Sequence, residues 1–314
     1  MVEISSRPQP TMRAATILTV LAFALGIGFT SLSAADRQPN FVIVLADDVS
    51  WSSFGCADAG LYTRTPNIDK LATQGLRFAN FSCAAAQCSP ARHELYTGLL
   101  PPSSGVYTNG NRPAGDFKNM VNYLGDLGYQ VGLTGKTHFK TTTEFPSIPG
   151  FSSDGNSDAP TWEMSGVKRF IEKSREKEKP FCVVVASVHA HHPWTMGDAS
   201  HFPVDRMVLP PHMVDTAMTR EALARHAAEV EDLDNQVGAT MQLLDDMKLA
   251  EDTVLIFLSE QGTALPQGKW SIYDYGTRAV CLVRWPGEIK PAVTDAVAMY
   301  CDIVPTLVDL AGGA

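Results

Sequence analysis

The chain has 314 residues, of which 45% are hydrophobic and 19% are charged, a balance typical of globular proteins with a large buried core. This composition excludes an intrinsically disordered chain. The formal net charge of −9 argues against a nucleic-acid-binding protein, because such proteins carry a basic patch or stripe.

Residues 1–35 have the pattern of a secretory signal peptide. Arg13 precedes an uncharged, mostly apolar run, which ends in small residues before Asp36. A membrane anchor is the alternative, but the strongly apolar part is shorter than the roughly 20 residues that a span needs. We therefore expect an exported protein, periplasmic or extracellular, with no stable membrane anchor and with one mature domain at 36–314.

Short apolar runs predict four β-strands, which lie at 41–46, 129–133, 181–188 and 254–258. Their apolar residues are continuous rather than alternating, as in strands that are covered on both faces of a largely parallel sheet. Helical patterns between them predict a short helix at 67–75, capped by Thr65 or Asn67, and a long amphipathic helix at 219–247. This alternation of strand and helix predicts the α/β class.

Two segments rich in Ser, Gly, Pro and Asp, at 141–164 and 195–215, predict long loops, which in compact domains are often functional. The last predicted element is a helix that begins near Pro305 and ends on Gly312 and Gly313.

Cys88 lies at the predicted N-terminus of another helix, because Pro90 suits a first turn and Gly98 a last one. The N–H groups and the positive dipole end at such a position suit an anionic ligand or a reactive thiol. The chain has six cysteines with irregular spacing. Disulfides are therefore permitted in an exported protein, but no C-x-x-C pair indicates a zinc site.

Ionisable residues, and one glutamine, follow the four predicted strands. Ligands of open α/β sheets bind beyond the carboxyl ends of the strands, so we expect these residues to converge. Each alone has an ordinary explanation, such as a helix cap, packing or a surface charge, but their joint occurrence favours a functional site. In chain order they are Asp47, Asp48, Lys136, His138, His189, His191, His192, Glu260 and Gln261, with Lys269 shortly after.

These residues fall into two chemical sets. One set offers only oxygens, which suit a hard cation such as Ca²⁺ or Mg²⁺; it comprises Asp47, Asp48, Glu260 and Gln261. The other offers cations and proton donors, which suit a tetrahedral oxyanion and its leaving group; it comprises Lys136, His138, His191 and Lys269. Together with a reactive group at a helix N-terminus, the two sets predict a hydrolase of phosphate or sulfate esters.

Residues 88–92, CSPAR, followed by Tyr96, Thr97 and Gly98, resemble the type I sulfatase signature C-x-P-x-R with a downstream T-G. The resemblance covers nearly everything after the leader, in order through 40–48, 65–69, 135–138, 191–193, 259–262, 273–278 and 283–287. Type I sulfatases belong to the alkaline phosphatase superfamily. The resemblance therefore implies an alkaline-phosphatase-like α/β sandwich, with a mostly parallel central sheet and helices on both faces.

The resemblance also implies roles for individual residues. A maturation enzyme would convert Cys88 to Cα-formylglycine, whose hydrate is the nucleophile, and Arg92 would orient that hydrate. The metal, usually Ca²⁺ with Mg²⁺ as the alternative, would be held by Asp47, Asp48, residue 88, Glu260 and Gln261. The sulfate would contact Lys136, His138, His191 and Lys269, with His191 or Lys269 as the acid. Among the three histidines, His191 matches the H-x-P pattern of the family.

The chain departs from the family pattern at three points. Glu260-Gln261 replaces the commoner Asp-Asn or Asp-His pair, which lengthens each ligand by one methylene. Ala190 lies where proline is usual. The chain ends after the helix at 302–310, where family members continue into a smaller C-terminal subdomain, so we expect that subdomain to be largely missing.

The sequence thus predicts a sulfuric ester hydrolase that acts on a sulfated saccharide or an aryl sulfate. The segments 105–109 and 209–211 and the long helix loosely resemble those of glycosaminoglycan sulfatases. Two alternatives remain: a phosphonate or phosphate ester hydrolase of the same superfamily, and an inactive, truncated fragment.

Overall fold

The computed structural model describes residues 38–57, 62–153 and 161–314. The signal peptide predicted at 1–35 lies outside these ranges, as does part of the loop predicted at 141–164. Within the described ranges, no helix has the length and apolar character needed to cross a membrane.

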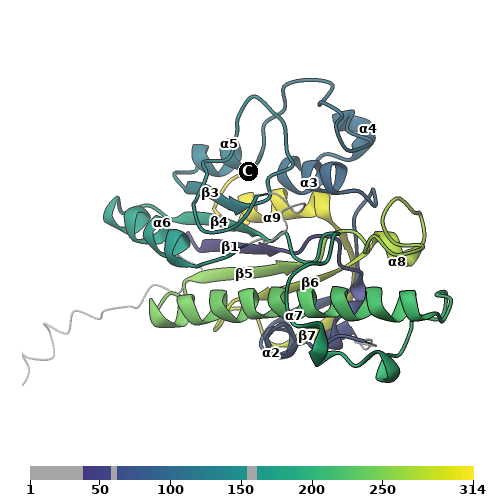
Figure 1. Cartoon of the computed structure of the whole chain (residues 1–314). Helices are drawn as coiled ribbons and strands as arrows, with labels where there is room; N and C mark the ends of the chain where they lie inside the picture. The colour runs from purple at the N-terminus through teal and green to yellow at the C-terminus, as the bar shows by residue number, and fades with distance from the viewer. Residues whose placement is uncertain (1–37, 58–61, 154–160) are drawn as a thin grey trace, which may run out of the picture.

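A seven-stranded sheet in the order β3-β4-β1-β5-β6-β2-β7 forms the centre of the molecule (Figure 1). Strands β3, β4, β1 and β5 are parallel, whereas β6 is antiparallel to both of its neighbours, and β7 is parallel to β2. The predicted, largely parallel sheet is therefore confirmed. The strands are β1 (Asn40–Leu45), β2 (Leu76–Ser82), β3 (Gln130–Gly135), β4 (Phe181–Ala186), β5 (Thr253–Leu258), β6 (Arg278–Arg284) and β7 (Ala292–Met299).

The four predicted strands correspond to β1, β3, β4 and β5. β6 also contains a continuous apolar run, at 279–283, which the prediction missed. The prediction did not include β2, β6 or β7. β7 forms an edge of the sheet and leaves most of its residues exposed, and β2 is mostly half-buried, so neither carries the apolar signal of a central strand.

Helices cover both faces of the sheet, as the resemblance implied (Figure 1). The alternation of side chains along β1 builds the two cores. Phe41 and Ile43 pack with helices α3, α5 and α9, whereas Val42 and Val44 pack with α2, α6 and α7. The helices are α2 (Pro66–Thr73), α3 (Cys88–Thr97), α4 (Pro101–Ser104), α5 (Met120–Asp126), α6 (Ser165–Glu176), α7 (Ala217–Asp246), α8 (Asp274–Thr277) and α9 (Ile303–Leu310).

The predicted helices at 67–75 and 219–247 are α2 and α7, and Thr65, one of the two predicted caps of α2, lies at the N-cap position. The Thr65 side chain, however, makes no capping hydrogen bond. The carboxylate of Asp234 on α7 instead accepts the backbone N–H groups of Asn67 at 3.1 Å and Ile68 at 2.8 Å. A residue distant in sequence therefore satisfies the open N–H groups of this helix.

The segment predicted as a loop at 195–215 packs on the first half of α7. It contains two short 3₁₀ turns, η4 (Ala199–His201) and η5 (Val204–Arg206). Phe202 and Met207 are buried against Leu223 and its neighbours in a third, smaller core. This segment is therefore held in place by apolar contacts.

Candidate active site

Helix α3 begins at Cys88, as predicted, and all of its residues are buried. The N-terminus of α3 is closed by the loop that follows α4: the side-chain oxygen of Asn109 accepts the N–H of Ser89 at 2.9 Å, and the Asn109 N–H donates to Gln87 at 3.0 Å. One of the open N–H groups expected there is therefore already paired.

The Cys88 thiol does not have the properties of a reactive thiol. Burial raises its pKa well above the usual value, and the negative charges of Glu260, Asp47 and Asp48 raise it further. The thiolate, which is the nucleophilic form, is disfavoured in this environment. Of the two alternatives left by the sequence, an anionic ligand and a reactive thiol, burial and the surrounding carboxylates disfavour the thiol.

Asp47 and Asp48 leave β1 into the centre of the site. Asp47 pairs with Lys136, whose Nζ lies 2.5 Å from its Oδ2. Burial opposes ionisation of Asp47, but the charges of Lys136 and Arg92 lower its pKa far below the usual range. Asp48 has a positive φ of 54°. Its Oδ1 lies 3.5 Å from the sulfur of Cys88.

Glu260 and Gln261 follow β5 and are fully buried. Glu260 pairs with the guanidinium of Arg92, with 2.6 Å between Nε and Oε1. Burial and the neighbouring Asp47 raise the pKa of Glu260 to about 8, against the effect of Arg92. The amide of Gln261 donates to Asp48 and lies 3.3 Å from the sulfur of Cys88.

The oxygen ligands predicted for a metal do converge. One potential ligand atom from each of Asp47, Asp48, Cys88 and Glu260 lies within 4.8 Å of the others. Among the described residues, Oε2 of Glu260 and Oε1 of Gln261 are buried and accept no hydrogen bond. Clustered carboxylates with unpaired oxygens are unfavourable unless a cation or a proton lies between them, so this donor set fits a hard divalent cation.

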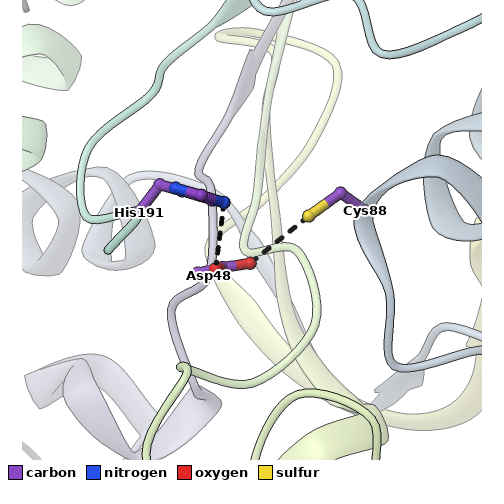
Figure 2. Close-up of side chains that lie close together, drawn as sticks. All are labelled: Asp48, Cys88 and His191. Atoms are coloured by element: carbon purple, nitrogen blue, oxygen red, sulfur yellow. Dashed lines mark hydrogen bonds and ion pairs between the residues drawn. The ribbon is translucent and has the colours of Figure 1, made fainter. Parts of the chain in front are cut away.

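Lys269 and His191 approach the same carboxylate, Asp48. The Nζ of Lys269 lies 2.8 Å from Oδ2 of Asp48, and the Nε2 of His191 lies 3.6 Å from it. Lys269 and His191 are 3.4 Å apart. Figure 2 shows that His191 and Cys88 point toward Asp48 from opposite sides. Burial opposes the charge of Lys269, but Asp48 raises its pKa above the usual value, so the ammonium form is favoured.

Lys136 directly follows the last residue of β3, Gly135, where the chain turns in a conformation that requires glycine. Gly135 has a φ of +89°, and a Cβ there would collide with the carbonyl oxygen of Ala186. The turn directs Nζ of Lys136 to within 3.8 Å of the Cys88 sulfur. Two residues later, His138 is half-buried, and burial together with Lys136 and Arg92 lowers its pKa to about 4. His138 is therefore neutral at pH 7.

The three histidines after β4 have different surroundings. His191 faces Asp48 and Lys269, as described above. His189 is buried, and its Nδ1 lies 3.5 Å from Asp232 of α7. The ring of His192 packs edge-on against Trp194. Of the three, His191 is the one that the fold directs into the site.

Sequence reasoning did not identify the residues that hold this loop. Oε1 of Glu229, on α7, accepts the backbone N–H groups of Thr195 at 2.7 Å and Met196 at 3.0 Å. The indole N–H of Trp194 donates to the carbonyl of Ala190 at 2.8 Å. Their partners are backbone groups, which leave no trace in the sequence pattern.

The chain belongs to the sulfatase family, whose model matches residues 39–314. It is 27% identical over 287 residues to an ulvan-active sulfatase of Formosa agariphila, covering 90% of this chain and 56% of that protein. It is also 27% identical over 363 residues to arylsulfatase A of Homo sapiens, covering 93% of this chain and 67% of that protein. The chain thus spans roughly half to two thirds of the length of these curated relatives.

Solved structures share the fold. One of them, in complex with its substrate D-glucosamine-2-N,6-O-disulfate, has a TM-score of 0.73 and 20% identity, over 88% of this chain and 77% of that chain. A phosphonate monoester hydrolase of Agrobacterium radiobacter has a TM-score of 0.65 and 20% identity, over 87% of this chain and 74% of that chain. The alkaline-phosphatase-like sandwich implied by the resemblance is confirmed by these similarities.

Proposed function

We propose that the protein is a sulfuric ester hydrolase whose nucleophile is the hydrate of a formylglycine formed from Cys88. The observation that carries this proposal is the position of Cys88, at the start of α3 and beside the carboxylate of Asp48, with 3.5 Å between Sγ and Oδ1. The buried thiol itself is a poor nucleophile because its pKa is raised. The nucleophile of an aldehyde hydrate is a hydroxyl group, so its reactivity does not depend on the pKa of the thiol.

The charges of the site support an anionic substrate. Three acidic side chains, Asp47, Asp48 and Glu260, pair with three basic side chains, Arg92, Lys136 and Lys269. We propose that Asp47, Asp48, Glu260, Gln261 and residue 88 hold a divalent cation, Ca²⁺ or Mg²⁺, which would add positive charge that stabilises a sulfate group. The pKa of Glu260, raised to about 8 by burial, would then be lowered by the cation.

Each reaction step has a residue to perform it. One hydroxyl of the hydrate attacks sulfur and gives its proton to Asp48, while the bond between sulfur and the leaving oxygen breaks. His191 protonates that oxygen, because Asp48 holds Lys269 in its ammonium form as a sulfate-binding cation. The second hydroxyl then gives its proton to His191, the aldehyde re-forms, and sulfate leaves. Water regenerates the hydrate, and Asp48 releases the proton it accepted to the solvent.

The proposed substrate is a sulfated saccharide or an aryl sulfate. The names of the relatives, an ulvan-active sulfatase and arylsulfatase A, support this class, as does the sugar disulfate bound by a fold neighbour. We also propose that the leader at 1–35 directs export and is removed. Sequencing the N-terminus of the exported protein tests that part.

The deciding experiment is mass spectrometry of the peptide that contains residue 88, after expression with a formylglycine-generating enzyme. We expect an aldehyde in place of the thiol and turnover of 4-nitrophenyl sulfate, with neither in the Cys88→Ala variant. An unmodified thiol in an active enzyme would overturn the mechanism. Absence of turnover in the modified protein would favour the inactive fragment.

A phosphonate or phosphate ester hydrolase is the second candidate. The fold shared with a phosphonate monoester hydrolase favours it, and cations such as Lys136 and Lys269 accept any tetrahedral oxyanion. The rates on matched aryl sulfate and aryl phosphonate esters separate the two. Faster turnover of the phosphonate would replace the sulfatase proposal.

A further inference from the structure

Trp270, which directly follows Lys269, is exposed beside the candidate active site. It is 66% exposed, whereas the other four of the chain's five tryptophans, all in described ranges, are buried or half-buried. An exposed apolar side chain is common by itself and needs a further reason to be assigned a function. The backbone and the position of Trp270 give two such reasons.

The backbone of Trp270 has a φ of +64°, in the left-handed region that a bulky residue rarely adopts. Hydrogen bonds fix this conformation: the N–H of Trp270 donates to Ala86 at 2.7 Å, and the N–H of Lys269 donates to Thr263 at 2.8 Å. Residues held in such conformations concentrate at functional sites, where the surrounding structure enforces them. The contact with Ala86 also ties Trp270 to the segment that leads into Cys88.

The indole ring lies next to the cations that we propose to bind sulfate. Its centroid is 5.2 Å from Nζ of Lys269, and that Nζ is 3.4 Å from Nε2 of His191 and 2.8 Å from Asp48. The organic part of a sulfate ester is joined to sulfur through one oxygen. The organic part of an ester whose sulfate contacts Lys269 and His191 would therefore lie within reach of this ring.

We propose that Trp270 is a specificity-determining residue on which the sugar ring of a sulfated saccharide stacks while its sulfate occupies the site. The inference rests on the proposed sulfatase function and adds the residue that selects the leaving group. An indole face offers a large, rigid apolar area that can cover the C–H face of a pyranose. An acyclic leaving group would gain little from such a contact.

The alternative is that Trp270 only supports Lys269 through the contact between its ring and the ammonium. The two roles differ in what they affect. A support for Lys269 changes the binding of every sulfate, including inorganic sulfate, which has no ring. A stacking platform changes only the binding of ring-bearing substrates.

The test compares Trp270→Ala, Trp270→Phe and Ile272→Ala in protein with modified residue 88. Ile272 is the matched control, because its side chain is 95% exposed on the same segment. The substrate is the one turned over fastest in a panel of sulfated mono- and disaccharides that includes D-glucosamine-2-N,6-O-disulfate. We expect Trp270→Ala to raise KM about tenfold, or about 1.4 kcal/mol, with kcat nearly unchanged. Trp270→Phe should raise KM less, and Ile272→Ala should leave it unchanged.

Inhibition by inorganic sulfate is the second measurement, and its inhibition constant should be the same in all variants. An unchanged KM in Trp270→Ala overturns the proposal, and so does an equal loss of affinity for inorganic sulfate. If the wild-type protein hydrolyses 4-nitrophenyl sulfate but none of the saccharides, the sugar assignment is wrong. If it hydrolyses neither, the proposed function itself has failed.

Discussion

The guanidinium of Arg92 and the carboxylate of Glu260 form a fully buried ion pair, with 2.6 Å between Nε and Oε1. Arg92 lies one turn into α3, and Glu260 follows β5, so the pair connects the helix that carries Cys88 to the end of the central sheet. Arg92 also donates to the carbonyl of Lys136. One side chain thus holds three segments of the site together.

Replacing Arg92 with Met should destabilise the protein strongly, by about 3–5 kcal/mol, because it leaves the buried carboxylate of Glu260 without a partner. Urea unfolding without divalent cations and at pH 9, above the pKa of about 8 of Glu260, measures the change. The double variant Arg92→Met, Glu260→Met is the control, and it should recover part of the loss, because no unpaired charge remains. A double variant that is as unstable as the sum of the single variants would contradict this explanation.

Removal of the proposed divalent cation should inactivate the protein and lower its melting temperature. Carboxylates gathered around Asp48 lose the stabilisation of a bound ion, which amounts to about 2.7 kcal/mol when the ion is present at 100 times its Kd. Ca²⁺ should restore more of the activity and of the melting temperature than Mg²⁺. The longer side chains of Glu260 and Gln261 depart from the family pattern, and Ca²⁺ tolerates irregular ligand geometry better than Mg²⁺ does. Differential scanning calorimetry with added ions checks this, and Asp48→Ala should not respond to them.

The His191→Gln substitution should reduce the rate of hydrolysis more for substrates with poor leaving groups than for substrates with good ones. If His191 protonates the leaving oxygen, its loss costs a saccharide sulfate about 10²-fold to 10⁴-fold in kcat/KM, which reports the steps up to departure of the leaving group and leaves out the later release of sulfate. 4-Nitrophenyl sulfate needs little protonation and should lose far less. Equal losses on both substrates would show that His191 binds sulfate without donating a proton. Lys269→Met, by contrast, should slow both substrates alike.

Glu229 should make stability depend on pH. Burial raises its pKa from 4.5 to about 7, so the folded state holds this proton more tightly than the unfolded state. The contribution is fully present below about pH 4.5 and is lost as the pH rises through about 7, by up to about 3 kcal/mol. Urea unfolding of the wild type and of Glu229→Gln between pH 4.5 and 8 measures the difference. The substituted amide stays neutral and still accepts hydrogen bonds, so the wild type should lose stability relative to the variant.

Part of the site followed from the strand pattern alone. Asp47, Lys136, His191 and Glu260 all come after continuous apolar runs, and parallel strands bring such residues to one edge. These strands could be predicted from the sequence, because a strand that is buried on both faces needs a continuous run of apolar residues.

Other features depend on tertiary contacts that no local pattern encodes. Asp234 caps α2 from a distant helix, and Glu229 binds backbone N–H groups whose identity the sequence does not reveal. The positive φ and the exposure of Trp270 likewise arise from where the chain is tied, at Ala86. The pKa of Cys88 could not be predicted from its place on the helix, because it is set by burial and by carboxylates from two strands.

The complete burial of α3 has a consequence for biosynthesis. Cys88 is 0% exposed, and every residue of its helix is buried. An enzyme that converts this cysteine must bind the chain around it, which the folded protein does not permit. If the proposed formylglycine forms, its formation would therefore precede the closing of the core, and a chain that folds first would keep its thiol. Under the proposed mechanism, the active fraction of a preparation is decided during synthesis and is not recovered by later treatment of the native protein.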